Sequence, residues 1–152
     1  MMIDGRREPK LRTTDEPMSW VLEPLMDIPH VRHGVVLASD GLVQGRSTNL
    51  PRVDAEGASA MLAGIISSSR GLLGAFAGSD GPEDVRQVVV EGHHGYVFLT
   101  GAGRNAVIAV YTDTGVDLGV VAHEVQVQVK KLGRAMSTPA RQHGSGAVGA
   151  VS

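Results

Sequence analysis

The sequence contains no cysteine, which excludes disulfide bonds, thiolate nucleophiles, cysteine-ligated zinc and iron–sulfur clusters. Aromatic residues are scarce, with one Trp, two Tyr and two Phe in 152 residues. Positive charge is scarce as well: the formal net charge is −2, and lysine occurs only at Lys10, Lys130 and Lys131. A chain with no basic surplus and few side chains on which bases can stack is poorly suited to nucleic acid, so no nucleic-acid partner is expected.

Long hydrophobic runs are also missing. The longest weakly charged run, residues 57–69, is rich in serine and shorter than the about 20 apolar residues that span a bilayer. The N-terminal residues are polar and arginine-rich, and no apolar segment of a secretory signal follows them. These absences predict a cytoplasmic protein without direct membrane insertion.

What is present is typical of one globular domain, with 42% hydrophobic and 20% charged residues. Residues 1–15 are polar and are expected to form a flexible leader. Residues 137–152 contain Gly144, Gly146 and Gly149 without apolar periodicity and are expected to form a disordered tail. The folded domain is therefore expected to span residues 16–136.

Apolar periodicity and turn residues predict an α+β fold in the order helix, strand, strand, helix, strand, strand, strand, helix. Pro24 should shorten or kink the first helix, and Gly41 should supply the positive φ of a hairpin turn between the first two strands. Asp54 is the expected N-cap of the long second helix. The expected ranges are 17–28, 35–38, 42–46, 54–77, 85–91, 96–100, 106–111 and 117–136.

The last segment is ambiguous between strand and helix. Residues 125–129 alternate as a strand does, but one helical stripe runs over five turns, and we favour a helix with Asp117 as its N-cap. The stripe comprises Leu118, Val121, Ala122, Val125, Val129, Leu132 and Met136.

The long second helix has two contrasting sides. The apolar side is expected to pack on the sheet and comprises Ala58, Met61, Leu62, Ile65, Leu72, Leu73 and Phe76. The other side is almost bare of side chain, and we call it the small-residue face; it comprises Gly57, Ala60, Gly64, Ser67, Ser68, Gly71 and Ala75.

Glycine inside a helix costs about 1 kcal/mol relative to alanine, so Gly64 and Gly71 weaken the helix that contains them. Gly57, Gly64 and Gly71 recur at intervals of seven, which keeps them nearly in register on the helix surface. This pattern predicts close approach of another backbone to the small-residue face, most simply in a homodimer. The alternative is that a loop of the same chain covers this face.

Sequence signals for chemistry are weak. No Gly-Lys-Ser/Thr phosphate loop exists, and the glycines of residues 101–103 precede a strand rather than the helix of a dinucleotide site. His93 and His94 are adjacent and should point apart, while His123-Glu124 lacks a second histidine at helical spacing. Arg70 is better read as a solvated charge or salt-bridge partner than as an arginine finger. We therefore expect no enzyme activity, catalytic residue, metal or cofactor.

Several segments together resemble the Roadblock (dynein light chain Roadblock-type) family, over about residues 17–136. They are the Trp20-Val21-Leu22 helix opening, the hairpin of residues 34–42 with Ser39-Asp40-Gly41-Leu42, the small-residue helix, the turn of residues 91–95 and the Asp117-Leu118-Gly119 helix start. The chain looks most similar to the bacterial MglB-like branch and to actinobacterial Roadblock proteins encoded in conserved operons. Those operons also encode a small Ras-like GTPase and a sensor-kinase-like protein.

The resemblance implies a Roadblock/profilin-like fold, in which a five-stranded antiparallel sheet carries the long helix on one face and the terminal helices on the other. It also implies a homodimer whose long helices lie side by side and contact the switch regions of a Ras-like GTPase, without supplying catalytic groups. A sensor-kinase-like membrane protein is a further implied partner, which would recruit the protein to the inner membrane face. The implied pairing strand comprises Val85, Arg86, Gln87, Val88, Val89, Val90 and Glu91.

Three other functions stay open from the sequence. A small-molecule sensor would need a sizeable cavity between helix and sheet. An enzyme would need a cleft or metal that unites His93, His94 or His123 with Glu124. A pure adaptor would bind the same partners without changing the rate of GTP hydrolysis.

Overall fold

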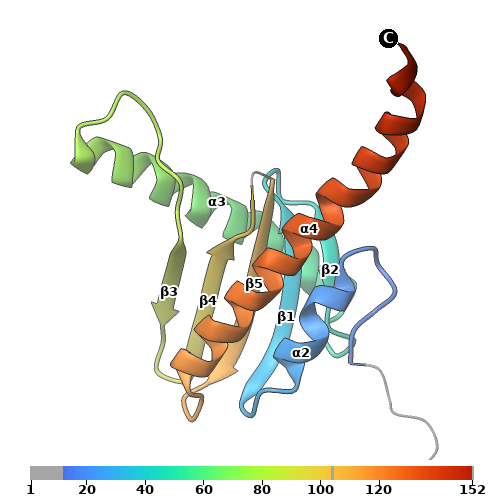
Figure 1. Ribbon diagram of the computed structural model, residues 1–152. Coiled ribbons are helices and arrows are strands. Elements are labelled where there is room, and N and C mark those ends of the chain that lie inside the picture. Colours follow the sequence, from blue (N-terminus) through green and yellow to red (C-terminus); the bar gives the residue numbers. More distant parts are fainter. Residues whose placement is uncertain (1–11, 104, 152) are drawn as a thin grey trace, which may run out of the picture.

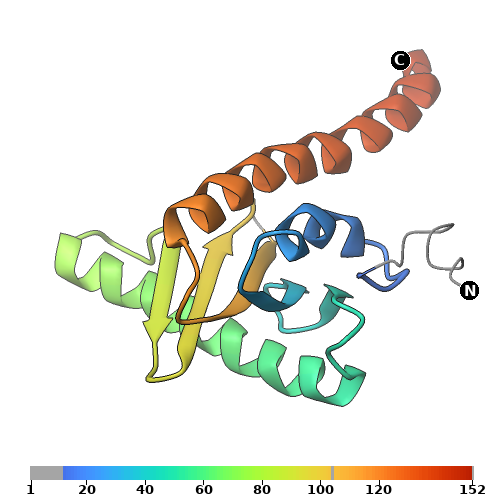
Figure 2. The ribbon, with the colours of Figure 1, turned by 90° about the horizontal axis from the view of Figure 1, so that it is seen from below.

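The computed structural model describes residues 12–103 and 105–151, with side chains described as far as residue 135. Five antiparallel strands form one sheet in the order β2-β1-β5-β4-β3. Helix α3 crosses one face, whereas η1, α2 and α4 cover the other, as the sequence and its resemblance predict (Figures 1 and 2). The elements are η1 (Ser19–Leu22), α2 (Glu23–Met26), β1 (Val31–Ala38), β2 (Val43–Arg46), α3 (Arg52–Ala77), β3 (Gln87–Glu91), β4 (Gly95–Gly101), β5 (Ala106–Asp113) and α4 (Leu118–Val151).

The face under η1, α2 and α4 holds the larger hydrophobic core. Leu22 and Leu25 from the N-terminal helices meet Phe98 and Ile108 from the sheet, and all four side chains are buried. Val121, Val125 and Leu132 close this core from α4, which confirms the helical stripe predicted for the last segment. Gln128 is also buried on α4, where its side-chain amide donates a hydrogen bond to Glu124 Oε2 at 2.8 Å.

The face under α3 holds a smaller core. Leu62 and Ile66 of α3 pack on every second residue of the central strands. On β1 and β5 these residues lie opposite each other, as Val35 and Ala109 do. The buried members are Val35, Leu37, Ala55, Leu62, Ile66, Leu99, Val107 and Ala109. Alternate side chains of a strand point to opposite faces, so each central strand contributes to both cores.

The first helix is short, as Pro24 predicts: a 3₁₀ turn leads into the single α-helical turn of α2, which has proline at its start. The preceding residues differ from expectation. Thr13 is buried and bridges Ser47, while Thr14 N–H donates to the Arg46 carbonyl at 3.0 Å. Arg12, Thr13 and Thr14 therefore lie against the segment at the end of β2; residues 1–11 of the expected leader lie outside the described residues.

Of the three residues predicted to form a turn or to cap a helix, two are confirmed. Gly41 has φ +94° in the β1–β2 turn, and Asp117 Oδ1 accepts the backbone N–H groups of Gly119 and Val120 at the start of α4. The prediction for Asp54 is wrong, because α3 begins earlier, at Arg52, after Pro51 and without a side-chain cap. Proline there already fixes the φ of the residue preceding the helix, so Asp54 lies within the first turn instead of capping it.

The bounds of two further elements differ from expectation. Strand β3 begins at Gln87, opposite Thr100, so Val85 and Arg86 precede the strand. Helix α4 continues to Val151, whereas the sequence predicts that the domain ends at residue 136 and that an irregular tail follows. Local sequence does not account for this continuation, because residues 137–151 include Pro139 and three glycines, which are poor helix formers.

Candidate functional site

Strand β3 forms one edge of the sheet and is largely exposed. It pairs with β4 on one side, from Gln87 opposite Thr100 to Glu91 opposite Tyr96, and has no strand neighbour on the other side in the described chain. Val89 and Val90 are exposed although apolar. An exposed, apolar, unpaired edge is a template for pairing with another strand. This is the strand in which the resemblance places the dimer contact, although Val85 and Arg86 lie before it.

The small-residue face of α3 points away from the sheet. All seven of its residues are exposed, from Gly57 to Ala75. A Cβ atom added at Gly57, Gly64 or Gly71 would meet no atom of the described chain within 4 Å. No loop among the described residues therefore covers these glycines, so the alternative of an intramolecular cover has no support within that part of the chain. The face carries no charged side chain and presents backbone directly to solvent.

The predicted apolar side of α3 is only partly correct. Leu62 is buried and Ala58 and Ile65 are half-buried, but the larger side chains at the C-terminal end are exposed, including Phe76 at 84%. The side that faces the sheet is rotated by roughly a quarter of a turn. It is centred on Ala55, Ser59, Leu62, Ile66 and Gly74.

The burial of Gly74 comes from the loop that follows α3 and not from the sheet: a Cβ at Gly74 would lie 2.2 Å from the Gly81 carbonyl oxygen. The large apolar residues are left on one exposed flank of α3, and we call Met61, Leu72 and Phe76 the apolar flank. The last turns of α3 project beyond β3, so the end of this flank is not covered by the sheet (Figures 1 and 2). The sequence placed these residues on the side expected to pack on the sheet, so their exposure was not predicted. The available signal was that apolar side chains extend around more of the helix than one sheet can cover.

An apolar groove of about 420 Å³ runs beside the apolar flank. Ala58, Met61 and Ile65 of α3 form one wall, while Val90 and Val97 belong to the sheet wall. The groove therefore joins the apolar flank to the edge strand, which makes these two separate sequence features one continuous surface.

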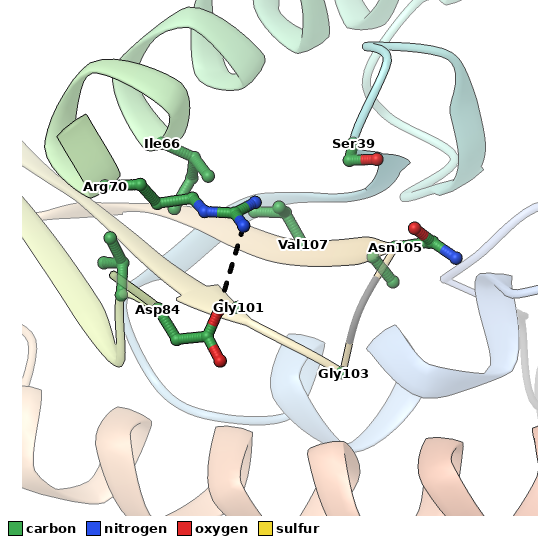
Figure 3. A pocket seen from close by; sticks show the side chains of 10 residues that line it. Ser39, Ile66, Arg70, Asp84, Gly101, Gly103, Asn105 and Val107 are labelled. Atoms are coloured by element: carbon green, nitrogen blue, oxygen red, sulfur yellow. Dashed lines mark ion pairs between the residues drawn. The ribbon is translucent and has the colours of Figure 1, made fainter. Parts of the chain in front are cut away.

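A second cavity lies beside Ile66 and Arg70, near the residues that precede β3 (Figure 3). Arg70 forms an ion pair with Asp84, with Nη2 3.8 Å from Oδ1. The interpretation of Arg70 as a salt-bridge partner is thus confirmed by the structure.

Histidines do not gather into a site. His93, His94 and His123 are exposed, and Glu124 is engaged by Gln128. Within residues 12–103 and 105–151, no group of three or more His, Asp or Glu side chains is arranged to hold a metal ion.

One carboxylate is electrostatically perturbed, at the end of β5. Partial burial of Asp113 acts to raise its pKa, but hydrogen bonds from Gly115 N–H, Arg32 and His30 outweigh this effect and lower the pKa below 3.8. The His30 contact spans 2.7 Å and the Arg32 contact 2.6 Å. This cluster ties the start of β1 to the end of β5 and has a structural role.

Helix α3 is long and apolar enough, by length and composition, to cross a membrane. The weakly charged run of residues 57–69, from which the sequence predicts no membrane span, is only part of this helix. In the structure α3 instead lies on the sheet through Leu62 and Ile66.

Comparison with known proteins identifies the fold. The family model described as Roadblock/LC7 domain matches residues 19–112. The crystal structure of a Roadblock/LC7 domain from Streptomyces avermitilis is 30% identical with a TM-score of 0.70, covering 80% of this chain and 98% of that one.

Two MglB structures share the fold at lower identity. Myxococcus xanthus MglB is 17% identical with a TM-score of 0.69, covering 79% of this chain and 94% of its own. A structure described as MglB with tetrameric arrangement is 19% identical with a TM-score of 0.65, covering 84% and 95%. A comparison with curated protein sequences gave no match. Through its family model and its resemblance to the Streptomyces domain, the chain belongs to the Roadblock/LC7 domain family.

Proposed function

We propose that this protein is a non-catalytic regulator of a small Ras-like GTPase and that it acts as a homodimer. The observation that carries the proposal is the continuity of three exposed features: the free edge of β3, the apolar groove beside it and the apolar flank of α3. Exposed apolar surface of this kind marks a protein–protein contact. Membership in the Roadblock/LC7 family supports the proposal, as do MglB-like neighbours, one of which is described as tetrameric.

In the proposed dimer, β3 pairs with β3 of a second copy and extends the sheet across both chains. The apolar flank of each α3 then packs against the second copy. Met61 and Phe76 of one copy cover the groove of the other. This arrangement assigns the dimer contact of α3 to the apolar flank. The small-residue face, opposite the sheet, stays accessible on both copies for the GTPase.

The small-residue face suits a partner that changes conformation. It lacks long side chains, so a partner backbone can approach closely, and it carries no charge that must be desolvated. We propose that it binds the switch regions of the GTP-loaded state more tightly than those of the GDP state. Only such a difference in affinity can shift the GTPase between its states. Any acceleration of hydrolysis comes from ordering the GTPase's own catalytic residues.

The proposed setting is the cytoplasm, with recruitment to the inner membrane face through a partner. The resemblance suggests a sensor-kinase-like membrane protein as that partner, and co-purification of the two proteins tests this part of the proposal.

The dimer is tested by sedimentation equilibrium on the full chain. Leu72→Ser and Val90→Glu should weaken self-association at least about tenfold, since each places a polar or charged group in a dry contact. Leu42→Ser is the matched control, because Leu42 is exposed to a similar extent, 63% against 57% for Leu72, but lies in the β1–β2 turn. A wild-type monomer, or equal weakening by Leu42→Ser, contradicts the proposed dimer.

The GTPase interaction is tested with a small Ras-like GTPase from the same organism, loaded with a GTP analogue or with GDP. We expect tighter binding of the GTP-analogue form. Gly64→Leu, which fills open space on the small-residue face, should reduce binding while leaving the dimer intact. Gly64→Ala is the smaller control. Equal binding of both nucleotide states, or no binding, contradicts the proposal; state-selective binding with unchanged hydrolysis and exchange rates identifies an adaptor instead.

A further inference from the structure

The cavity beside Arg70 has the size of a small-molecule site. It measures about 720 Å³ and lies between the C-terminal half of α3, the segment before β3 and the β4–β5 turn. Ligand pockets typically measure about 300–1,000 Å³. Its lining shares no residue with the lining of the apolar groove.

Arg70 is the one basic side chain among the described residues that line this cavity. Its Nε is buried and has no hydrogen-bond partner among the described residues. Its Nη2 approaches Asp84 at 3.8 Å, but the Asp84 side chain is fully exposed, and such a long, solvated ion pair stabilises little. The two Nη groups therefore keep most of their four N–H donors available for a ligand, whereas the buried Nε–H is not exposed to the cavity.

The surroundings of Arg70 combine neutral polar groups with an apolar wall. Figure 3 shows Arg70 extending from α3 across Val107, with Ser39 and Asn105 on the far side of the cavity. Ser39 is fixed there by its backbone N–H, which donates to the Asn105 carbonyl at 3.0 Å. Ile66 and Val107 supply apolar surface beside the guanidinium.

We propose that this cavity binds a small organic oxyanion, either a phosphate monoester or a carboxylate. Arg70 holds the charged group of this ligand. Guanidinium matches both groups through paired N–H···O hydrogen bonds. The apolar body of the ligand rests on Ile66 and Val107, and Ser39 and Asn105 hydrogen-bond its polar atoms. Asp84 competes for Arg70 and limits the affinity. The inference is independent of the proposed GTPase regulation.

The test is an NMR titration of the full chain that follows the Arg70 Nε–H signal and the backbone amides of Gly101 and Gly103. The probes are inorganic phosphate, phenyl phosphate and benzoate, with chloride at matched ionic strength as the blank. We expect saturable shifts, and tighter binding of phenyl phosphate than of inorganic phosphate because its ring covers apolar surface. The relative affinities of phenyl phosphate and benzoate show whether phosphate or carboxylate is preferred.

Variants decide whether Arg70 holds the anion. Arg70→Gln should weaken phenyl phosphate or benzoate binding at least about tenfold, because a charge-assisted hydrogen bond is lost. Asp84→Asn should tighten binding about two- to threefold by removing the competing carboxylate. Arg134→Gln, an exposed residue of α4, makes the same charge change and should alter binding little.

The proposal is overturned if the shifts do not saturate, or if Arg134→Gln weakens binding as much as Arg70→Gln. It is also overturned if Arg70→Gln abolishes self-association while wild-type protein binds none of the probes, since Arg70 would then belong to an interface between copies. Equal thermal midpoints for the wild type and Arg70→Gln show that the variant is folded. Loss of GTPase binding in a chain that still binds phenyl phosphate would contradict the proposed function alone.

Discussion

One face of the sheet, under η1, α2 and α4, is filled by large buried side chains such as Phe98, Leu22 and Leu25. The other face, under α3, is covered by one helix that buries few residues, of which Leu62 and Ile66 are the largest, and it retains a groove and a cavity. Large apolar side chains of α3 lie outside this contact, Phe76 among them. The difference teaches that the first face holds the larger buried core of the domain, whereas the second leaves apolar surface exposed beside its helix.

The largest expected effect comes from comparing the two phenylalanines. Phe98→Ala should lower the free energy of unfolding by about 3–5 kcal/mol, because Phe98 is 2% exposed and its loss leaves a cavity. Phe76→Ala should change it by less than about 0.5 kcal/mol. Urea unfolding at low protein concentration, where dimer formation contributes least, measures both. A similar loss of unfolding free energy in both variants would contradict this, because it would show that Phe76 is packed against other residues of the same chain.

Two glycines of α3 provide the next comparison. Gly74→Ala should destabilise the fold by about 1–3 kcal/mol, since its Cβ would lie 2.2 Å from the Gly81 carbonyl oxygen. Gly71→Ala should stabilise the isolated chain by about 0.5–1 kcal/mol, because its Cβ meets open space and alanine is the better helix former. Thermal unfolding distinguishes the two. Destabilisation by Gly71→Ala would place a neighbouring segment on the small-residue face.

Buried hydroxyl groups test both faces with a smaller effect. Thr100 lies on the α4 face, and Ser59 on the sheet-facing side of α3; both are buried, and neither side-chain oxygen has a hydrogen-bond partner among the described residues. Thr100→Val and Ser59→Ala should therefore leave stability unchanged or raise it by up to about 1 kcal/mol. Denaturant unfolding measures this, and a loss above about 1 kcal/mol in either variant would reveal a hydrogen bond to that hydroxyl.

The smallest effect concerns pH and the cluster that joins β1 to β5. Because the pKa of Asp113 is lowered in the fold, its ionised form adds stability above the ordinary value of 3.8, and that stability is lost as pH falls through the lowered pKa. Asp113→Asn should thus be less stable than wild type near neutral pH, and the difference should fade in acid. Unfolding measured from pH 7 to pH 2 tests this; a difference that grows in acid would contradict it.

The order of helices and strands could be predicted because local signals agree with the tertiary structure. Gly41 supplies the positive φ of its turn, Asp117 caps α4, and the α4 stripe of Val121, Val125 and Leu132 is buried. Asp54 shows the limit of such signals, since Pro51 starts the helix one turn earlier. Thr13 shows another limit: nothing local indicates that a polar N-terminal residue will pair with Ser47.

The candidate site depends more strongly on tertiary structure. The sequence by itself determined that α3 has one nearly bare face, since glycine spacing at seven residues follows from helix geometry alone. It did not determine which side of α3 meets the sheet, because apolar residues extend around the helix beyond one face. Packing of Ala55, Leu62 and Ile66 on the sheet decided that orientation, and with it the exposure of the apolar flank and the placement of Arg70 at a cavity. Side-chain contacts between distant segments set these features, and periodicity within one segment carries no information about such distances.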